Sequence, residues 1–266
     1  MKNVAVLIHP DEGQEARVQA ALDVTRALNG HLIAVEVTAL VPVAEDPMLG
    51  AFSAGLVAEE LARQEENLAD MLERLGGEDV AWSADRCAGD VGYCLSQHTA
   101  LADLIVLNTQ FDSFPGREMG HLTAALVALH RPVLAVPSDS RGVADRHAAM
   151  VAWDGSDAAE AALRAAIPLL ALHPETHVVS VARGSINRPP ELAASYLSRH
   201  GIKPEITVIT NDADTVASNL IVQARGVDAS LIVMGGYGHS RLRESLFGGV
   251  TRTLLEESHC PLFLSH

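Results

Sequence analysis

Two glycine clusters near the C-terminus have the residue types and the spacing of a phosphate-binding site. The first, Gly235–Gly238, follows the apolar run Leu231–Met234, and the second, Gly248–Gly249, follows after nine intervening residues. Glycine tolerates positive φ and lets a ligand approach the main chain closely. The segment after Gly249 has the pattern of a helix, and unpaired N–H groups in the first turn of a helix attract anions. The spacing therefore predicts a phosphate site between a strand end and a helix start.

The charges around these glycines agree with an anionic ligand. The whole chain has a formal net charge of −15. The motif nevertheless carries four basic residues against one acid: His239, Arg241, Arg243 and Arg252 against Glu244. A basic spot on an acidic chain favours an anion, whereas a solvated arginine face paired with carboxylates elsewhere is the alternative interpretation.

The spacing differs from that of two common phosphate-binding loops. A P-loop needs G-x-x-x-x-G-K-[ST], but the only lysines, Lys2 and Lys203, are far from the glycines. The dinucleotide fingerprint G-x-G-x-x-G places its glycines closer together. A phosphate here must therefore be held by backbone N–H groups, hydroxyls or arginine. A tight strand-to-helix turn without a ligand is the alternative interpretation of the same glycines.

The motif resembles the nucleotide-binding signature of the universal stress protein family. That signature is G-x-x-G, nine residues and G-[S/T], which corresponds here to Gly235, Gly238, Gly248 and Gly249. The neighbouring residues Met234, His239, Ser240, Leu242 and Val250 are also similar to the family. Gly249 departs from the pattern, because the family has Ser or Thr there. One phosphate-facing hydroxyl is therefore missing, while the backbone N–H remains.

The resemblance implies a site for ATP or another adenine nucleotide, with or without Mg²⁺. Asp154 matches the family's aspartate after the first strand, which can accept from ribose hydroxyls, although a helix N-cap is an equally good role for it. We expect Ser156 to be an N-cap. The resemblance places Ala152 beside the base and Val181 against adenine.

We expect the phosphates to be held mainly by the N–H groups of Gly238, Gly249 and Val250. Ser240, with Arg241 or Thr251, would assist them. His239 either touches phosphate or faces solvent. The complete expected set is Ala152, Asp154, Val181, Met234, Gly235, Gly238, His239, Ser240, Arg241, Gly248, Gly249, Val250 and Thr251.

Short apolar runs recur in the same order in the two halves of the chain. The correspondences are 4–8 with 149–153, 31–35 with 177–181, 102–107 with 228–234, and 131–136 with 260–264. Apolar runs that alternate with helical segments are typical of doubly wound parallel α/β sheets. We predict two tandem Rossmann-like domains, 1–140 and 143–266, similar to the adenine nucleotide α-hydrolases. Each should carry a five-stranded sheet, and the resemblance implies that the two pack as an internal pseudo-dimer, as single-domain members of the family pair.

The first half lacks the glycine motif. Asn108 and Phe111 stand at the positions of Gly235 and Gly238, and Phe114 and Pro115 would crowd a phosphate. We therefore expect the first half to be a degenerate domain that has lost nucleotide binding. It is then either structural or a site for a more apolar ligand.

Two helices of the first half are expected from spacing. One runs from Gln14 to Leu28, and an amphipathic one runs from Val57 to Leu75. Because it contains Pro42 and Pro47, Thr38–Gly55 is expected to be a loop.

Composition limits the class of protein. The acidic charge disfavours nucleic acid and anionic membranes as partners, and no apolar run approaches the ~20 residues of a membrane span. The N-terminus leads directly into an apolar strand rather than a signal peptide, so we expect a cytoplasmic protein. Cys87 and Cys94 allow a redox pair, but we expect unpaired thiols, as for Cys260. The histidines form no metal-binding pattern, so no metal site is expected.

Three functions remain open from the sequence. The resemblance implies a stress-response protein that binds ATP, ADP or AMP in its C-terminal domain. The second possible function is that of an enzyme. No catalytic residue stands out, and the motifs of ATP-dependent ligases are absent. The sequence therefore supports at most a slow ATPase. A nucleotide-independent protein that dimerises through its last strands is the third. A homodimer or an intramolecular pseudo-dimer would suit the first and third functions.

Overall fold

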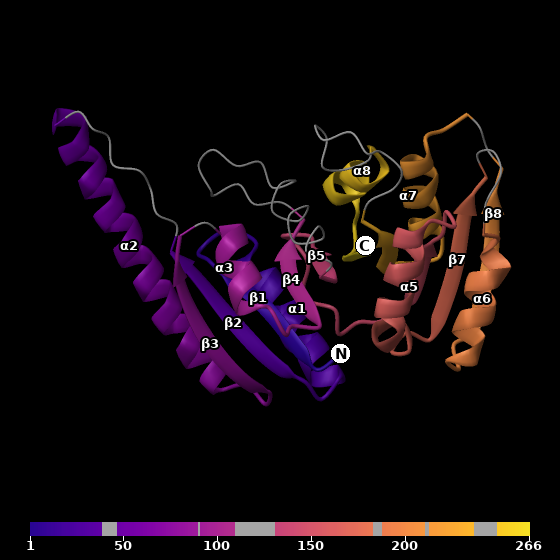
Figure 1. The fold of residues 1–266 in the computed structure, drawn as a ribbon, viewed down its shortest axis with the longest axis horizontal. Coiled ribbons are helices and arrows are strands. Elements are labelled where there is room, and N and C mark those ends of the chain that lie inside the picture. The colour runs from indigo at the N-terminus through magenta and orange to yellow at the C-terminus, as the bar shows by residue number, and fades with distance from the viewer. Residues whose placement is uncertain (39–46, 90, 110–130, 183–187, 211–212, 237–248) are drawn as a thin grey trace.

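Strands and helices alternate along the chain. The computed structural model describes residues 1–38, 47–89, 91–109, 131–182, 188–210, 213–236 and 249–266 (Figure 1). The elements up to the linker are β1 (Asn3–Ile8), α1 (Gln14–Ala27), β2 (His31–Thr38), α2 (Pro47–Gly76), β3 (Ala81–Ala88), α3 (Val91–His98), β4 (Leu104–Asn108) and β5 (Val133–Val136). Those after it are β6 (Ala148–Ala152), α5 (Asp157–Leu170), β7 (Glu175–Val181), α6 (Pro190–Arg199), β8 (Pro204–Ile209), α7 (Val216–Gly226), β9 (Ala229–Gly235), α8 (Gly249–Glu257) and β10 (Leu262–Ser265).

The strands form one ten-stranded sheet in the order β3-β2-β1-β4-β5-β10-β9-β6-β7-β8. Read from either outer edge, the order of each five-strand set is the same, with β1 and β6 in third place. Pairing within each set is parallel, and the sets meet where β5 and β10 pair antiparallel, Leu134 opposite Phe263. The prediction of an α/β fold with mostly parallel strands is confirmed, but the prediction of a separate five-stranded sheet in each half is wrong, because β5 and β10 join the two sets. The sets form one continuous sheet, because pairing β5 with β10 satisfies two edges that would otherwise be exposed.

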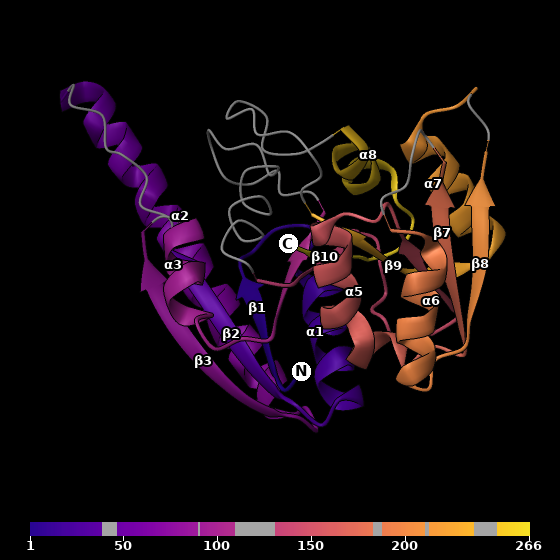
Figure 2. The same ribbon diagram turned by 45° about the vertical axis from the view of Figure 1, so that its right-hand side comes forward.

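Helices cover both faces of the sheet, as Figures 1 and 2 show. Along each strand, alternate residues point to opposite faces, which explains the two separate cores. One core packs β1, β6 and β10 against α1, α2, α5 and α6, with residues such as Val6, Leu22 and Phe263 buried. The other packs the opposite face against α3, α7 and α8. Both faces of the inner strands are therefore apolar, which is why these strands appear in the sequence as continuous apolar runs, whereas the edge strands β3 and β8 are largely exposed.

One predicted helix boundary is wrong. The helix α1 follows its prediction closely, but α2 begins at Pro47 rather than near Val57, so the predicted loop is too long. Proline is compatible with the first turn of a helix, because the N–H that it lacks has no partner within the helix there. Pro47 therefore starts the helix instead of breaking it.

The expectation of unpaired thiols is wrong for two of the three cysteines. Cys87 at the end of β3 forms a disulfide with Cys94 on α3, whereas Cys260 is free and buried. The turn between β3 and α3 brings the first two together, and sequence spacing alone does not show this. Burial raises the pKa of the Cys260 thiol to about 11, so that it stays protonated. No helix in the described ranges is both long and apolar enough to cross a membrane.

Candidate functional site

The expected site lies where the strand order of the second set reverses. From β6 the chain continues outward to β7 and β8, and then returns to β9 on the other side of β6. In open α/β sheets, ligands bind at the carboxyl ends of the strands beside such a reversal. Asp154 follows β6, Val181 ends β7 and Gly235 ends β9. The fold thus brings three of the expected site residues to the carboxyl ends of adjacent parallel strands. The helix α8 lies near the same end of the second strand set (Figure 1).

Gly235 allows α5 to lie directly against the end of β9. A Cβ atom at this position would lie 2.7 Å from the backbone N of Ala159 and 2.8 Å from the carbonyl carbon of Ala158. Both are backbone atoms, so no change of rotamer could relieve the contact. The first glycine of the motif is therefore required by helix packing, independently of any ligand.

The turn after β6 resolves the roles of Asp154 and Ser156. The Ser156 hydroxyl accepts a hydrogen bond from the Ala159 N–H at 3.1 Å and caps α5, as predicted. Asp154 Oδ1 accepts from the Ser156 N–H at 2.9 Å, while the Asp154 residue is exposed. Asp154 is thus not the N-cap of α5. The hydrogen bond from Ser156 fixes one oxygen of the Asp154 carboxylate. The carboxylate also faces solvent, where it can accept further hydrogen bonds.

A contact that the sequence does not indicate lies beside this turn. Arg188, just before α6, accepts a hydrogen bond from the Trp153 indole N–H at 2.9 Å through its carbonyl oxygen. Its guanidinium donates to Asp157 at 2.6 Å, which raises the pKa of Arg188. Gly155 has φ +73°, and a Cβ there would lie 2.8 Å from the Arg188 carbonyl oxygen. The contact between Gly155 and Arg188 therefore joins two loops that are 33 residues apart in the sequence.

The start of α8 offers backbone donors rather than side chains. Gly249 is exposed and Val250 is half-buried, whereas Thr251 is buried. The first N–H groups of a helix have no partner within the helix and can bind an anion. Thr251 is only 4% exposed, so little of its side chain is open to a ligand in this conformation.

The remaining expected residues divide into two groups. Ala152 and Val181 are half-buried at their strand ends, and Met234 is 6% exposed within the core. Five expected residues lie outside the described part of the chain: Gly238, His239, Ser240, Arg241 and Gly248. Among the described residues, no group of three or more His, Cys, Asp or Glu side chains has the arrangement of a metal site.

Comparison with known families finds a match in the C-terminal part of the chain. The model of the universal stress protein family matches residues 146–266. Residues 146–266, a little under half of the chain, are therefore the part that matches the universal stress protein family. The Synechocystis universal stress protein Slr1230 is 28% identical over 182 residues, which are 64% of this chain and 60% of the relative. The chain therefore matches less than two thirds of that relative's length.

Solved structures are similar to the chain over nearly its whole length. A universal stress protein from Archaeoglobus fulgidus has a TM-score of 0.73 at 17% identity, covering 98% of this chain and 97% of its own. The protein PA1789 from Pseudomonas aeruginosa has a TM-score of 0.62 at 17% identity, covering 99% and 92%. At this identity the similarity establishes the fold alone. The universal stress protein fold thus extends over both five-strand sets.

The equivalent position in the first set is occupied by a buried side chain. Asn108 ends β4 where Gly235 ends β9 in the universal stress protein half, and it is completely buried. Its Nδ2 donates to the Gly13 carbonyl oxygen at 2.9 Å, and its Oδ1 accepts from Arg17 at 2.7 Å. A Cβ at Gly13 would lie 2.5 Å from Asn108 Cγ. An asparagine side chain therefore separates α1 from β4, whereas α5 touches β9 directly.

Arg17 continues this network beneath the end of β1. Its side chain is fully buried and donates to Asp11 at 2.6 Å, to the Leu7 carbonyl at 2.7 Å and to the His9 carbonyl at 2.6 Å. Burial lowers the pKa of Arg17, and the Asp11 carboxylate opposes that shift. The strand ends of the first set thus hold a buried ion pair. Phe111, Phe114 and Pro115, which we expected to crowd a phosphate, lie outside the described residues.

We expect His9 to make stability depend on pH. Burial lowers its pKa from 6.5 to about 4, with Asp11, Arg17, Glu60 and Arg63 as smaller influences. The unfolded chain takes up a proton below its pKa, while the folded chain does so only near pH 4. Stability should therefore be retained above pH 6.5 and fall by about 3 kcal/mol toward pH 4.

Urea unfolding measured at half-unit steps from pH 7.5 to pH 4 checks this expectation. Asparagine at position 9 should flatten the slope between pH 6.5 and pH 5, where few carboxylates titrate. An unchanged slope in a folded His9→Asn protein would assign the pH dependence to other groups.

Proposed function

We propose that the universal stress protein half binds an adenine nucleotide, with or without Mg²⁺, at the carboxyl ends of β6, β7 and β9. The supporting observation is the exposed, turn-held carboxylate of Asp154 beside the strand reversal. Its oxygens can accept hydrogen bonds from the ribose hydroxyls, a role that a carboxylate at another strand end has in dinucleotide folds. Ala152 and Val181 provide half-buried apolar contacts for the base.

The phosphates would be held without lysine. The N–H groups of Gly249 and Val250 begin α8, and oriented N–H dipoles there favour negative charge. Gly238, His239, Ser240, Arg241 and Gly248 complete this proposal from the sequence motif. Such a site suits a protein that responds to adenine nucleotides during stress. A measurement of phosphate release decides whether the protein also hydrolyses ATP.

We propose one nucleotide per chain. In the first set, Asn108 and the Asp11–Arg17 pair occupy the strand ends, and a histidine, His9, stands where Asp154 stands in the second. An imidazole that burial keeps neutral and that is 3% exposed cannot replace an exposed carboxylate as the ribose acceptor.

The proposal is tested by isothermal titration calorimetry with ATP, ADP and AMP, and by mass spectrometry of nucleotide released from the denatured protein. We expect one site per chain. Alanine at Asp154 should weaken binding about tenfold, because a hydrogen bond to a charged acceptor contributes ~1.5–3 kcal/mol. Alanine at Asp145, an exposed linker carboxylate, is the matched control and should leave affinity unchanged.

Two equivalent sites per chain would contradict the asymmetry, and no binding of any adenine nucleotide would favour an interaction protein. In the described structure, however, β5 and β10 are already paired on both sides. Dimerisation through the edges of these last strands would require them to separate.

A further inference from the structure

At the carboxyl ends of the second strand set, Arg188 contacts three residues of the turn that carries Asp154. The Trp153 indole N–H donates to the Arg188 carbonyl oxygen at 2.9 Å. The Nη1 atom of Arg188 donates to the Gly155 carbonyl oxygen at 3.3 Å and to Asp157 Oδ1 at 2.6 Å. Arg188 is thus joined to the chain on both sides of Asp154.

Gly155 lies so close to the Arg188 main chain that no side chain fits between them. A Cβ at Gly155 would lie 2.8 Å from the Arg188 carbonyl oxygen and 3.0 Å from its backbone N. The Asp154 carboxylate is bonded across this glycine, because its Oδ1 accepts from the Ser156 N–H at 2.9 Å. A shift of Gly155 away from Arg188 would therefore turn the Asp154 carboxylate as well.

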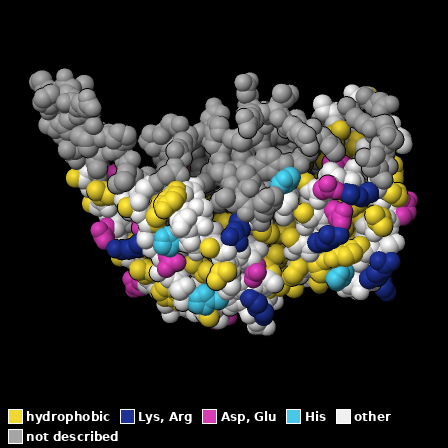
Figure 3. Space-filling model, in the orientation of Figure 1, with side chains coloured by type: hydrophobic (Ala, Val, Ile, Leu, Met, Phe, Trp, Pro, Cys, Tyr) yellow, Lys and Arg dark blue, Asp and Glu magenta, His cyan; other side chains and the backbone are white. Residues whose placement is uncertain are grey.

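The charges around Arg188 contribute little by themselves. Figure 3 shows acidic and basic side chains side by side over α5. Arg188 Nη1 pairs there with Asp157 at 2.6 Å and with Glu160 at 3.4 Å, and Glu160 also pairs with Arg164. The Arg188 side chain is 37% exposed and that of Asp157 is 91% exposed. Exposed ion pairs add little stability, so we expect the main effect of Arg188 to be on the geometry of the turn.

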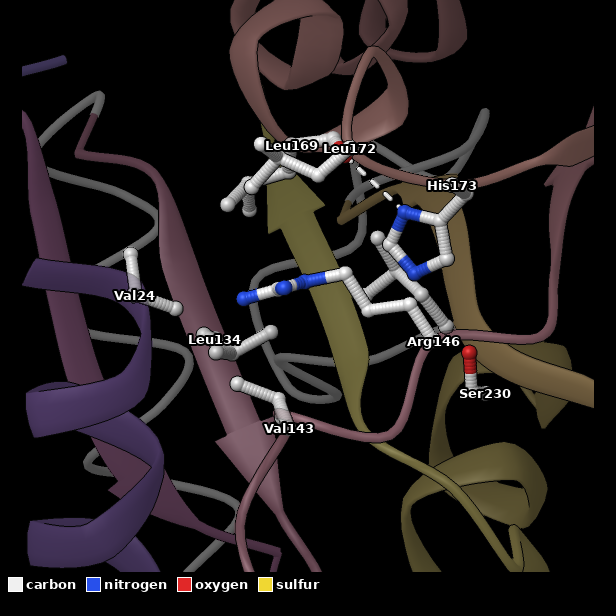
Figure 4. A pocket seen from close by; sticks show the side chains of 9 residues that line it. Val24, Leu134, Val143, Arg146, Leu169, Leu172, His173 and Ser230 are labelled. Carbon is white, nitrogen blue, oxygen red and sulfur yellow. Dashed lines mark hydrogen bonds between the residues drawn. The ribbon is translucent and has the colours of Figure 1, made fainter. Parts of the chain in front are cut away.

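The seam between the two strand sets, by contrast, is a packing interface. The pocket there is lined by residues of both sets and the linker, among them Leu134, Val143 and Leu169 (Figure 4). Its cavity of about 20 Å³ has room for about one water molecule. Arg146 borders this pocket but is partly exposed, so that water solvates its charge. The seam therefore has too little space for a small-molecule ligand.

We propose that Arg188 is a positioning residue for the ribose, and that the oriented Asp154 carboxylate makes the site select ribonucleotides over deoxyribonucleotides. This inference rests on the nucleotide binding proposed above. Because one Asp154 oxygen is held by Ser156, the direction of the other is fixed as well. A ribose offers two neighbouring hydroxyl donors to this carboxylate, and a deoxyribose has lost one of them. Since Asp154 is exposed, water can replace the missing hydroxyl, which limits the preference to about tenfold.

The test compares the affinities of ATP, 2′-deoxyATP and 3′-deoxyATP by calorimetry on the full chain. All three carry the same phosphates, so the ratio of their affinities cancels the effect of surface charge. The parent should bind ATP about tenfold more tightly than at least one deoxy nucleotide. In Arg188→Met protein this ratio should fall below ~3-fold, because the turn is no longer held.

Lysine at position 188 should restore most of the ratio. The described side-chain contacts of Arg188 are all made by Nη1, so a single ammonium group can replace them. Methionine at Arg164 is the matched control and should keep the ratio of the parent. Among the described residues Arg164 pairs with the same Glu160 and not with the turn.

Phenylalanine at Trp153 provides a second variant in case Arg188→Met does not fold. It removes the N–H that holds the Arg188 carbonyl oxygen and should also lower the ratio. A parent ratio near one for both deoxy nucleotides would overturn the inference while nucleotide binding stands. So would a ratio like that of the parent in folded Arg188→Met or Trp153→Phe protein, or an equal loss in Arg164→Met. If the parent binds no ATP, the proposed function itself fails, and this inference fails with it.

Discussion

Replacing Asp11 with alanine is expected to lower the free energy of unfolding by about 3–5 kcal/mol. The Asp11 carboxylate is 6% exposed and pairs with Arg17, whose side chain is 0% exposed. Removing it takes the paired carboxylate away from a buried guanidinium, and the Gly13 N–H loses its acceptor. A buried charge that has lost its partner costs far more than a surface pair contributes. Urea unfolding at pH 7 measures the change.

A second mutation separates the ion pair from the other contacts of these residues. Combining Asp11→Ala with Arg17→Met removes both charges, so the double variant should be about 0.5–3 kcal/mol more stable than the sum of the single effects predicts. Alanine at Glu65, which pairs with Arg86 on the surface at 3.3 Å, is the control. It should lower the free energy of unfolding by less than ~1 kcal/mol. Additive effects of Asp11 and Arg17 would contradict a coupled buried pair.

Replacing Gly235 with valine is expected to weaken nucleotide binding at least ~100-fold, or by ~2.7 kcal/mol. The new Cβ would lie 2.7 Å from the Ala159 backbone N, so the start of α5 must move away from β9. That movement displaces the turn that holds Asp154, and overpacking of this kind costs about 1–3 kcal/mol in stability. Calorimetry with ATP, on protein shown by circular dichroism to be folded, measures the loss.

Gly249 is the matched control, since it belongs to the same motif and has different surroundings. Among the residues that the structure describes, no atom lies within 4 Å of a Cβ at this position. Serine at this position also restores the family hydroxyl, so Gly249→Ser should keep ATP affinity and improve the selection of ATP over AMP. Alanine at Gly235 adds the same Cβ with less bulk, in case the valine variant does not fold. ATP binding like that of the parent in both Gly235 variants would show that this contact does not position the site.

Much of the architecture was predictable because it depends on local pattern. Buried parallel strands require apolar residues on both faces, so runs such as Leu231–Met234 are visible without a structure. The cap at Ser156 and the helix from Gln14 were also predictable, because hydroxyl caps and helical spacing act within a few residues. The association of Gly235 with a strand end followed from the same local pattern. The division into domains at 1–140 and 143–266 stays a prediction.

The remaining features depend on residues that are far apart in the chain. Asn108 is a departure from a glycine motif in the sequence, but in the fold it is the buried partner of Arg17, 91 residues away. The bond between Trp153 and Arg188, the Cys87–Cys94 disulfide and the pairing of β5 with β10 likewise require the folded backbone. Residue types and spacing determined the strands, the helices and the glycine motif, since those signals are periodic and local. Only the tertiary structure decided which strand ends hold a buried ion pair and which hold an exposed carboxylate, because burial is a property of the packed chain.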